Sequence, residues 1–284
     1  MYNYRKLHES GGVMTKVEGV IFDWAGTTVD FGCFAPVNVF ISIFKNAGVE
    51  VTMEEARRPM GMLKIDHIRE MLSMPRISTL WEEKYGRSFN EKDVESLYAE
   101  FEPALMASLT AYTDPIPEVI DTVGVLRENG LKIGSTTGYT STMMNVVVPN
   151  AAEKGYHPDV YVTPDETDLV GRPYPYMIYR NMEKLKLSAA WKTVKVGDTI
   201  SDVKEGMNAG VWSVGVIIGS SEMGLGLEEY SGLTQADKEV EIARTAQAFI
   251  GNGADFTIEK MGELPQLIEV INGLIAAGKR PGSQ

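Results

Sequence analysis

Cysteine is nearly absent from this chain: Cys33 is the only one among 284 residues. A single thiol excludes an internal disulfide framework, so the fold must be held together by its own packed core. This composition is typical of proteins from a reducing compartment. We therefore expect a cytoplasmic protein in which Cys33 packs against its neighbours rather than reacts.

Long hydrophobic runs and positive charge are also scarce. No apolar run approaches the roughly 18 residues of a membrane span, and no signal-peptide pattern precedes the first predicted strand. The formal net charge is −12, the opposite of the basic clustering of nucleic-acid binders. We expect neither a membrane nor a nucleic acid as a partner. Residues 1–16 are polar, and we interpret them as a flexible leader, with Met14 as an alternative start.

The most informative segment that is present reads VEGVIFDWAGTTVD, residues 17–30. Its apolar run up to Phe22 is typical of a buried parallel strand, and Asp23 ends that run. A carboxylate at the carboxyl end of such a strand faces the crevice in which open α/β sheets bind ligands. Asp23 is therefore our first candidate for a reacting group. The alternative is an aspartate that opens a turn.

A second pair of carboxylates follows a later strand, in KTVKVGDTISDVKEGMNAG, residues 192–210. Asp198 lies at the tip of the predicted strand, and Asp202 begins a helical segment four residues later, so one turn can direct both to the same place. Carboxylates that converge with Asp23 repel one another unless a cation lies between them, and hard oxygen ligands suit Mg²⁺. The alternative for Asp202 is N-terminal capping of its helix or a favourable interaction with the helix dipole.

Hydroxyl groups and one arginine complete the candidate set. The segment LKIGSTT, residues 131–137, predicts a strand that ends in Thr137, and such a tip can bind phosphoryl oxygens through hydroxyl and N–H groups. The loop GRPYP, residues 171–175, carries Arg172, whose guanidinium could neutralise phosphate charge. The alternative for Arg172 is a side chain that is simply solvated.

A lysine and a histidine interrupt a helical pattern that is otherwise lined by methionine. In RRPMGMLKIDHIREML, residues 57–72, we predict a helix from Met60 onward with Met60, Lys64, His67 and Met71 on one face. An apolar setting lowers the pKa of a lysine, which leaves more free amine for Schiff-base formation. The alternatives are a lysine whose ammonium reaches water and a histidine that is a satisfied polar residue.

The order of the predicted elements indicates an α/β fold with an insertion. Residues 35–112 are helical in pattern and form a predicted small helical cap domain, whereas residues 17–34 and 113–284 form a discontinuous core domain. In the core, strands and helices alternate, which predicts a doubly wound, Rossmann-like parallel sheet with helices on both faces. Residues 218–233 are Gly-rich, and we expect a loop there.

The order of these motifs along the chain resembles that of the haloacid dehalogenase superfamily of aspartate-nucleophile phosphotransferases. The motifs are Asp23 after a strand, Thr137 after a strand, Arg172, and Gly-Asp198-x-x-x-Asp202. The resemblance covers about residues 17–275. Phosphatases and mutases of that superfamily usually carry Asp-x-Asp, whose second aspartate is the general acid/base for the ester oxygen. Here that position is Ala25. Loss of such an acid commonly costs about 10²–10⁴-fold in rate, so ester hydrolysis is disfavoured.

Within the superfamily, the chain is similar to the phosphonatases, which split the carbon–phosphorus bond of phosphonoacetaldehyde into acetaldehyde and phosphate. The similarity rests on Asp-x-Ala-Gly-Thr-Thr, on MGMLKIDH, on STTGY and on GRPYP. A carbon leaving group departs as a carbanion. A protonated imine one bond away can accept the electron pair of that carbanion, which gives an enamine. The resemblance implies that Lys64 does this electrophilic work in place of the missing acid.

The resemblance also implies the covalent and metal chemistry. Lys64 forms the imine, and Asp23 attacks phosphorus to give an aspartyl-phosphate that water hydrolyses. The implied cofactor is Mg²⁺, held by Asp23, Asp198 and the backbone carbonyl of Ala25. Asp202 supports that metal site.

The substrate pocket follows from the same resemblance. Thr137 and Arg172 position the phosphonyl oxygens. The other residues that match the pocket lining are Tyr139, Met60, His67 and Cys33. His67 and Tyr139 are candidates to move protons around the imine, and the alternative for Tyr139 is ordinary packing.

The resemblance further implies a homodimer joined through the cap. Seven apolar cap side chains exceed what one small helical domain needs for its own core, so some of them could form a shared surface. These side chains are Met53, Met71, Leu72, Met74, Ile77, Leu80 and Trp81. The alternative is that all seven pack internally.

Two other functions stay open on the same fold. One is a phosphomonoesterase or sugar phosphomutase, in which an imine-forming Lys64 would have no task. The other is a non-catalytic phosphate-binding protein that lost the second aspartate; the retained Asp23, Asp198 and Asp202 argue against it. Our first hypothesis remains hydrolysis of phosphonoacetaldehyde, a small phosphonate, in the degradation of 2-aminoethylphosphonate.

Overall fold

Six parallel strands form one sheet in the order β3-β2-β1-β4-β5-β6. The structure is a computed structural model that describes residues 16–283, so nearly all of the predicted leader lies outside the described residues. The strands are β1 (Gly19–Phe22), β2 (Lys132–Thr136), β3 (Val160–Val162), β4 (Thr193–Gly197), β5 (Trp212–Val216) and β6 (Phe256–Ile258). The doubly wound parallel sheet that the sequence predicts is confirmed.

The sheet has its topological switch point between β1 and β4. The chain first adds β2 and β3 on one side of β1 and then adds β4, β5 and β6 on the other side. Phe22, the last residue of β1, pairs in register with Val196 of β4. Asp23 and Asp198 follow the two strands directly. The strand order therefore brings both carboxylates to the crevice in which such sheets bind ligands.

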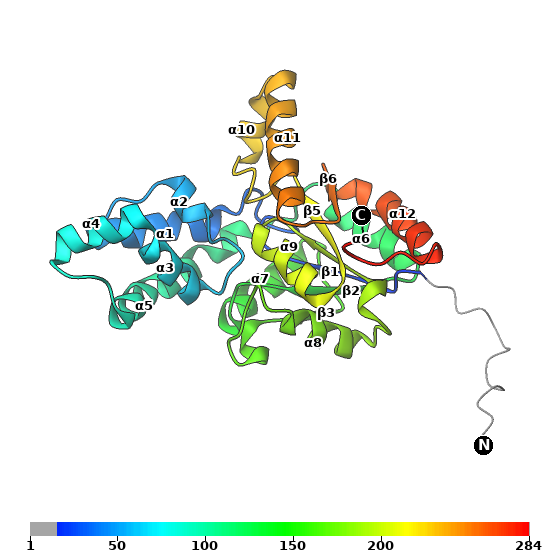
Figure 1. Ribbon diagram of the computed structural model, residues 1–284, viewed down its shortest axis with the longest axis horizontal. Coiled ribbons are helices and arrows are strands. Elements are labelled where there is room, and N and C mark those ends of the chain that lie inside the picture. Colours follow the sequence, from blue (N-terminus) through cyan, green and yellow to red (C-terminus); the bar gives the residue numbers. More distant parts are fainter. Residues whose placement is uncertain (1–15, 284) are drawn as a thin grey trace, which may run out of the picture.

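Helices cover both faces of the sheet (Figure 1). Val20 and Phe22 share a core with α6 (Val119–Glu128), α7 (Ser141–Glu153) and α12 (Leu264–Ala276). Ile21 packs on the opposite face with α8 (Tyr176–Leu185) and α9 (Ile200–Ala209). Because successive side chains of β1 are buried on opposite faces, the strand reads as a continuous apolar run.

The C-terminal part of the core contains one helix that the sequence did not predict. The connection after β5 includes α10 (Leu227–Gly232), so the expectation of a loop throughout residues 218–233 is wrong. Glu229, at the third helical position, accepts from Gly226 N at 3.4 Å through its Oε2, which is one of the two hydrogen bonds of a capping box. The next helix is α11 (Gln235–Gly251).

Helices α1–α5 form a group beside the sheet, drawn in blue to teal in Figure 1. They are α1 (Phe34–Asn46), α2 (Met53–Arg57), α3 (Lys64–Ser73), α4 (Pro75–Tyr85) and α5 (Glu91–Ser108). Two segments of the chain connect this group of helices to the sheet, and they lie side by side. Asp30 N donates to Asp114 O at 3.3 Å, and Ile116 N donates to Thr28 O at 2.9 Å. We propose that residues 35–112 form a separate cap domain.

The predicted helix from Met60 onward is wrong in its first turn. The chain leaves α2 at Arg57 and enters α3 only at Lys64. Gly61 has a φ of 86°, in the left-handed region that favours glycine, and a Cβ there would overlap the Thr199 hydroxyl. Met60 therefore precedes α3, and the loop between the helices is free to approach the sheet.

Most of the apolar cap side chains that suggested a shared surface are buried within the chain itself. The buried ones are Met71, Leu72, Met74, Ile77 and Trp81. For these five residues the internal-packing alternative is correct, whereas Met53 is exposed and Leu80 is half-buried, so only these two remain candidates for a shared surface. The homodimer stays a prediction that rests on the resemblance.

No helix within residues 16–283 has the length and apolar character needed to cross a membrane.

Candidate active site

A small cavity lies where the carboxyl ends of β1, β2 and β4 meet the start of α3. Its volume is about 10 Å³, which is room for about one water molecule. Seven of the predicted residues line it, namely Asp23, Ala25, Cys33, Lys64, Thr137, Tyr139 and Arg172. Three residues that the sequence did not single out complete the lining, namely Gly61, Gly138 and Thr199. The start of α3 and the ends of the strands thus both contribute to one small cavity.

Asp23 is fixed by the backbone and by one arginine. Its N–H donates to Val196 O at 2.9 Å, which continues the sheet by one residue. Its Oδ1 accepts from Arg172 Nη2 at 2.6 Å, and the side chain is 6 % exposed. A carboxylate held this way by a charge-assisted hydrogen bond is oriented and desolvated, as a nucleophile requires.

Three buried carboxylates converge at this end of the sheet. Asp23, Asp198 and Asp202 each offer an oxygen within 4.8 Å of the others. Asp198 accepts from Thr27 Oγ1 at 2.9 Å and from Ser221 N at 2.8 Å. Burial, together with the charges of Asp23 and Asp202, raises the pKa of Asp198 well above its usual range. This repulsion is what a divalent cation between the carboxylates would relieve.

The residues present fit a divalent metal. Gly26 has a φ of 88°, and a Cβ at this position would overlap Asp198 Oδ2, so only glycine lets the loop after β1 close on that carboxylate. Ala25, the residue before it, lines the cavity. Buried carboxylate and carbonyl oxygens are the ligands that hard divalent cations prefer.

Asp202 differs from the other two carboxylates because cations already surround it. Its Oδ1 lies 3.1 Å from Arg172 Nη1 and 2.9 Å from Lys195 Nζ. Burial alone would raise the pKa of Asp202, but Arg172 and Lys195 outweigh that effect, and the pKa is lowered. The side chain that caps α9 is Thr199, whose Oγ1 accepts from Asp202 N at 3.2 Å. Thr199, and not Asp202, is therefore the residue whose side chain caps α9.

Lys64 is the first residue of α3 and is only 3 % exposed. The alternative of an ammonium that reaches water is wrong, because the side chain is buried against the cavity. Burial lowers the pKa of Lys64, although the charge of Asp23 opposes that effect. Its Nζ lies 5.2 Å from the centre of the Tyr139 ring, within cation–π distance.

Met60 and His67 are close to the site but do not belong to the lining of the cavity. His67 Nε2 lies 2.9 Å from Ala56 O, so Nε2 carries the hydrogen and donates it. Its ring stacks on Phe40 with a centroid distance of 3.8 Å. Burial and the charge of Lys64 hold the pKa of His67 well below its usual range. His67 is thus a neutral imidazole one helical turn from Lys64, and Met60 is buried beside it in the same core.

The remaining predicted pocket residues are uncharged. Burial raises the pKa of Tyr139 and of the Cys33 thiol well above their usual ranges. Cys33 therefore lines the cavity as a thiol, in agreement with a packing role. Thr137 Oγ1 accepts from Tyr139 N at 3.0 Å, which fixes the tip of the loop after β2.

Arg172 is completely buried in a polar network, so the alternative of a solvated side chain is wrong. Its Nε donates to Glu205 Oε2 at 2.9 Å and its Nη2 donates to Thr136 Oγ1 at 2.7 Å. Lys195, Glu205 and Thr136 are residues that we did not predict from the sequence. One signal was available: a lysine in the middle of a strand expected to be buried needs a charged partner.

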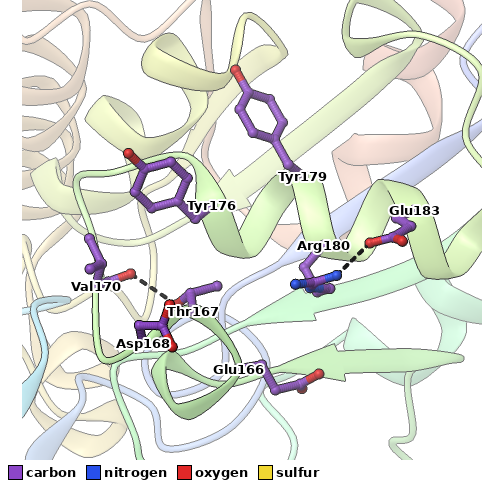
Figure 2. Close-up of a pocket in the computed structure, with 8 residues that line it drawn as sticks. All are labelled: Glu166, Thr167, Asp168, Val170, Tyr176, Tyr179, Arg180 and Glu183. Carbon is purple, nitrogen blue, oxygen red and sulfur yellow. Dashed lines mark hydrogen bonds and ion pairs between the residues drawn. The ribbon is translucent and has the colours of Figure 1, made fainter.

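A wider groove lies elsewhere, along α8 and the segment before it (Figure 2). Its volume is about 390 Å³. Arg180 in this groove already pairs with Glu183 at 2.7 Å. None of the predicted site residues lines it. We therefore place the candidate active site at the smaller cavity, where nucleophile, amine and acidic cluster meet.

Comparison with known proteins agrees with this arrangement of fold and site. Residues 17–210 match the family model of the haloacid dehalogenase-like hydrolases. The chain belongs to this family of hydrolases, and the superfamily resemblance predicted from the sequence is confirmed.

Within the family, the most similar proteins that we compared are phosphonoacetaldehyde hydrolases. The Lysinibacillus sphaericus phosphonoacetaldehyde hydrolase is 59 % identical over 261 residues, which cover 92 % of this chain and 97 % of that protein. A bifunctional phosphonoacetaldehyde hydrolase/aminoethylphosphonate transaminase from Clostridioides difficile is 58 % identical over 253 residues, 89 % of this chain but 40 % of that longer protein. The crystal structure of a phosphonoacetaldehyde hydrolase-like protein from Oleispira antarctica has a TM-score of 0.91 at 36 % identity, covering 98 % of this chain and 100 % of that one. The narrower resemblance to phosphonatases is confirmed.

Proposed function

We propose that this chain hydrolyses the carbon–phosphorus bond of phosphonoacetaldehyde to acetaldehyde and phosphate. One observation carries the proposal: Lys64 and Asp23 line the same small cavity. Formation of an imine has no task in the hydrolysis of a phosphate ester. It has an essential task when a carbon leaving group must accept an electron pair. The names of the similar proteins support the same substrate.

The first step is formation of an imine on Lys64. The free amine attacks the aldehyde carbon, the new carbon–nitrogen bond forms, and water leaves. The lowered pKa of Lys64 favours this free amine. The protonated imine carries a positive charge, which the face of the Tyr139 ring and the Asp23 carboxylate can stabilise. His67 and Tyr139 remain our candidates for moving protons at this stage.

The second step is attack of an Asp23 oxygen on phosphorus. The oxygen–phosphorus bond forms as the carbon–phosphorus bond breaks, and the electron pair of that bond enters the imine to give an enamine. Protonation of the enamine carbon and hydrolysis then release acetaldehyde and restore Lys64. Water hydrolyses the aspartyl-phosphate to free phosphate. Arg172, which holds Asp23 at 2.6 Å, is placed to bind the phosphonyl oxygens together with Thr137.

A divalent metal completes the site, and we propose Mg²⁺. Asp23, Asp198 and the carbonyl of Ala25 would hold it, with Asp202 in support. Its chemistry is the neutralisation of charge among the carboxylates and on the anionic substrate. In a chain of net charge −12, such local positive charge is needed to attract an anion.

The substrate does not fit the cavity in this conformation, since a volume of about 10 Å³ holds no phosphonate. We therefore propose that the cap, residues 35–112, moves away from the core to admit it. Closure then brings Lys64 to the aldehyde and removes water from the imine.

The biological setting follows from the fused relative. That protein joins the hydrolase name with an aminoethylphosphonate transaminase, an activity that converts an amine into the aldehyde that this site would use. We propose that the chain acts in the degradation of 2-aminoethylphosphonate, as a homodimer in a reducing, cytoplasmic compartment.

Incubation of the purified protein with phosphonoacetaldehyde tests the proposed function. We expect acetaldehyde and phosphate to appear in equal amounts and to require a divalent metal. A panel of phosphate monoesters, including a sugar phosphate, serves as the comparison and should be turned over at least about 100-fold more slowly, since the acid at position 25 is absent. Phosphate release from a monoester without acetaldehyde formation from the phosphonate would favour the esterase or mutase alternative.

A further inference from the structure

A second buried cation, Lys195, stands directly behind Arg172. Lys195 belongs to β4, and its side chain is 1 % exposed. Its Nζ lies 2.9 Å from Asp202 Oδ1 and 3.3 Å from Glu205 Oε2. It also donates to Thr136 Oγ1 at 2.8 Å. A lysine within a central parallel strand is costly to bury, and it is tolerated here because three oxygens surround its charge.

Arg172 contacts the same three side chains. Its Nε donates to Glu205, its Nη1 pairs with Asp202 at 3.1 Å, and its Nη2 donates to Thr136. Arg172 has two contacts that Lys195 lacks: its Nη2 donates to Asp23 Oδ1 at 2.6 Å, and its Nη1 donates to Gly61 O at 3.4 Å. Glu205 and Asp202 therefore anchor the guanidinium at Nε and Nη1, and Nη2 is the nitrogen that reaches the Asp23 carboxylate.

The charges in this network explain why a second cation is needed. Asp202 and Glu205 carry two negative charges at the back of the site, and Lys195 supplies one of the two positive charges that face them. Without Lys195, both carboxylates would compete for Arg172 alone. Arg172 would be drawn towards them, and uncompensated negative charge would lie beside the place where an anion must bind.

We propose that Lys195 and Glu205 are positioning residues for anion recognition by Arg172. Glu205 anchors the Nε edge of the guanidinium, and Lys195 neutralises the carboxylates behind it. Nη2 is thereby presented to the oxygens of the phosphonate substrate and of the phosphate product. Neither residue touches the reacting atoms. The inference rests on the proposed function insofar as it assigns those oxygens to Arg172.

A double-variant comparison separates positioning from mere stability. Lys195→Met and Glu205→Gln each leave one buried charge without its partner, so both should lower the melting temperature. The double variant removes both charges and should recover much of that loss. If the pair positions Arg172, the double variant should still bind inorganic phosphate at least about tenfold more weakly than the parent, with kcat/KM for phosphonoacetaldehyde lowered about 10–100-fold.

A matched control is available at the other end of the same strand. Lys192 directly precedes β4 and is 7 % exposed, and its Nζ lies 2.9 Å from Glu18 Oε1. The Lys192→Met/Glu18→Gln double variant carries the same chemical changes at the amino edge of the sheet. It should leave phosphate binding unchanged.

Direct binding of inorganic phosphate, measured by calorimetry with the metal present, keeps this test independent of turnover. Parental affinity for phosphate in a folded Lys195→Met/Glu205→Gln protein would overturn the proposal. If that protein does not fold, Thr136→Val removes only the hydroxyl that links Lys195 to Arg172, and unchanged phosphate affinity in it would count equally against us. A parent that binds phosphate but does not cleave phosphonoacetaldehyde would refute the proposed function and leave this inference to be decided by the variants.

Discussion

At the scale of single residues, Asp198 shows most directly why the site needs a cation. Its pKa is raised by burial and by two neighbouring carboxylates, whereas Asp202 has its charge compensated by Arg172 and Lys195. The two aspartates of one sequence motif therefore have different tasks. We propose that Asp198 holds the metal and that Asp202 belongs to the support behind it.

Replacement of Asp198 by alanine should weaken the metal more than it harms the fold. We expect the concentration of Mg²⁺ that gives half-maximal activity to rise about 10–100-fold, with partial rescue by excess Mg²⁺. The measurement is activity as a function of Mg²⁺ after treatment with EDTA. Asp168→Asn, an exposed change in the groove of Figure 2 at a position with a φ of 52°, is the control and should behave as the parent. Full activity of the parent in EDTA would contradict a metal role for these carboxylates.

Replacement of Ala25 by aspartate tests why the usual second carboxylate is missing. Ala25 and Lys64 line the same cavity, so a new carboxylate would raise the pKa of Lys64 and add negative charge where the anion binds. We expect slower cleavage of phosphonoacetaldehyde and a gain of weak activity on a phosphate ester, because a proton donor is restored. Ala25→Asn is the neutral control of similar size. Unchanged or faster cleavage in the aspartate variant would show that the alanine is incidental.

The candidate residues that could be predicted from the sequence share one property: they follow a strand or begin a helix. Asp23, Thr137 and Asp198 stand at strand ends, which a parallel sheet must gather at one edge. Lys195 and Glu205 could not be predicted in the same way. Their importance arises from side chains that meet across β4 and α9, and such meetings depend on packing rather than on any local pattern.

At the scale of elements, the junction between the sheet and α1 depends on a buried carboxylate. Asp30 has a φ of 58°, and its two oxygens accept from the backbone N–H groups of Phe34 and Ala35, each at 3.0 Å. Burial, opposed by these hydrogen bonds, raises the pKa of Asp30 to about 7 from 3.8. The protonated form is therefore favoured in the folded state.

The sign of the resulting pH dependence can be tested with Asp30→Asn. The contribution of Asp30 to stability is fully present below about pH 4 and is lost as pH rises through about 7. The neutral amide retains an acceptor oxygen and tolerates a positive φ, so its own contribution should not change with pH. We expect the melting temperature of the variant to rise relative to that of the parent between about pH 5 and pH 8. A constant difference over that range would contradict the raised pKa.

The break between α2 and α3 shows where prediction from local pattern failed. The spacing of Met60, Lys64, His67 and Met71 fits one helical face, yet the chain turns at Gly61. The turn is favoured because a loop at this position packs against the Thr199 loop of the core. That contact joins segments far apart in the sequence, and helix periodicity carries no information about it.

At the scale of the whole molecule, the expected homodimer is the prediction for which the structure offers the least support. Five of the seven apolar cap residues that suggested an interface are buried inside the chain, so the homodimer stays a prediction that rests mainly on the resemblance. Sedimentation at micromolar concentration decides the question. We predict a species of twice the 31.3 kDa chain mass, and a species of 31.3 kDa would refute the dimer.

We propose that the cap and the core cooperate, with Lys64 at the start of α3 forming an imine above Asp23, the residue that follows β1. Reduction with borohydride in the presence of phosphonoacetaldehyde should trap this imine as a stable adduct on Lys64, located by peptide mass analysis. Because the pKa of Lys64 is lowered, the rate of trapping should rise with pH and level off below 10.5, the ordinary value of a lysine.

The most direct test is this trapping experiment on the parent and on Lys64→Arg. The arginine keeps the charge but forms no imine at neutral pH, so we predict no adduct and a fall in turnover of more than about 1,000-fold, the scale of losing a covalent catalyst. Lys84→Arg, an exposed change in α4, is the matched control and should be trapped and active like the parent. An adduct on another lysine, or turnover in Lys64→Arg above a few hundredths of the parental rate, would contradict the imine mechanism.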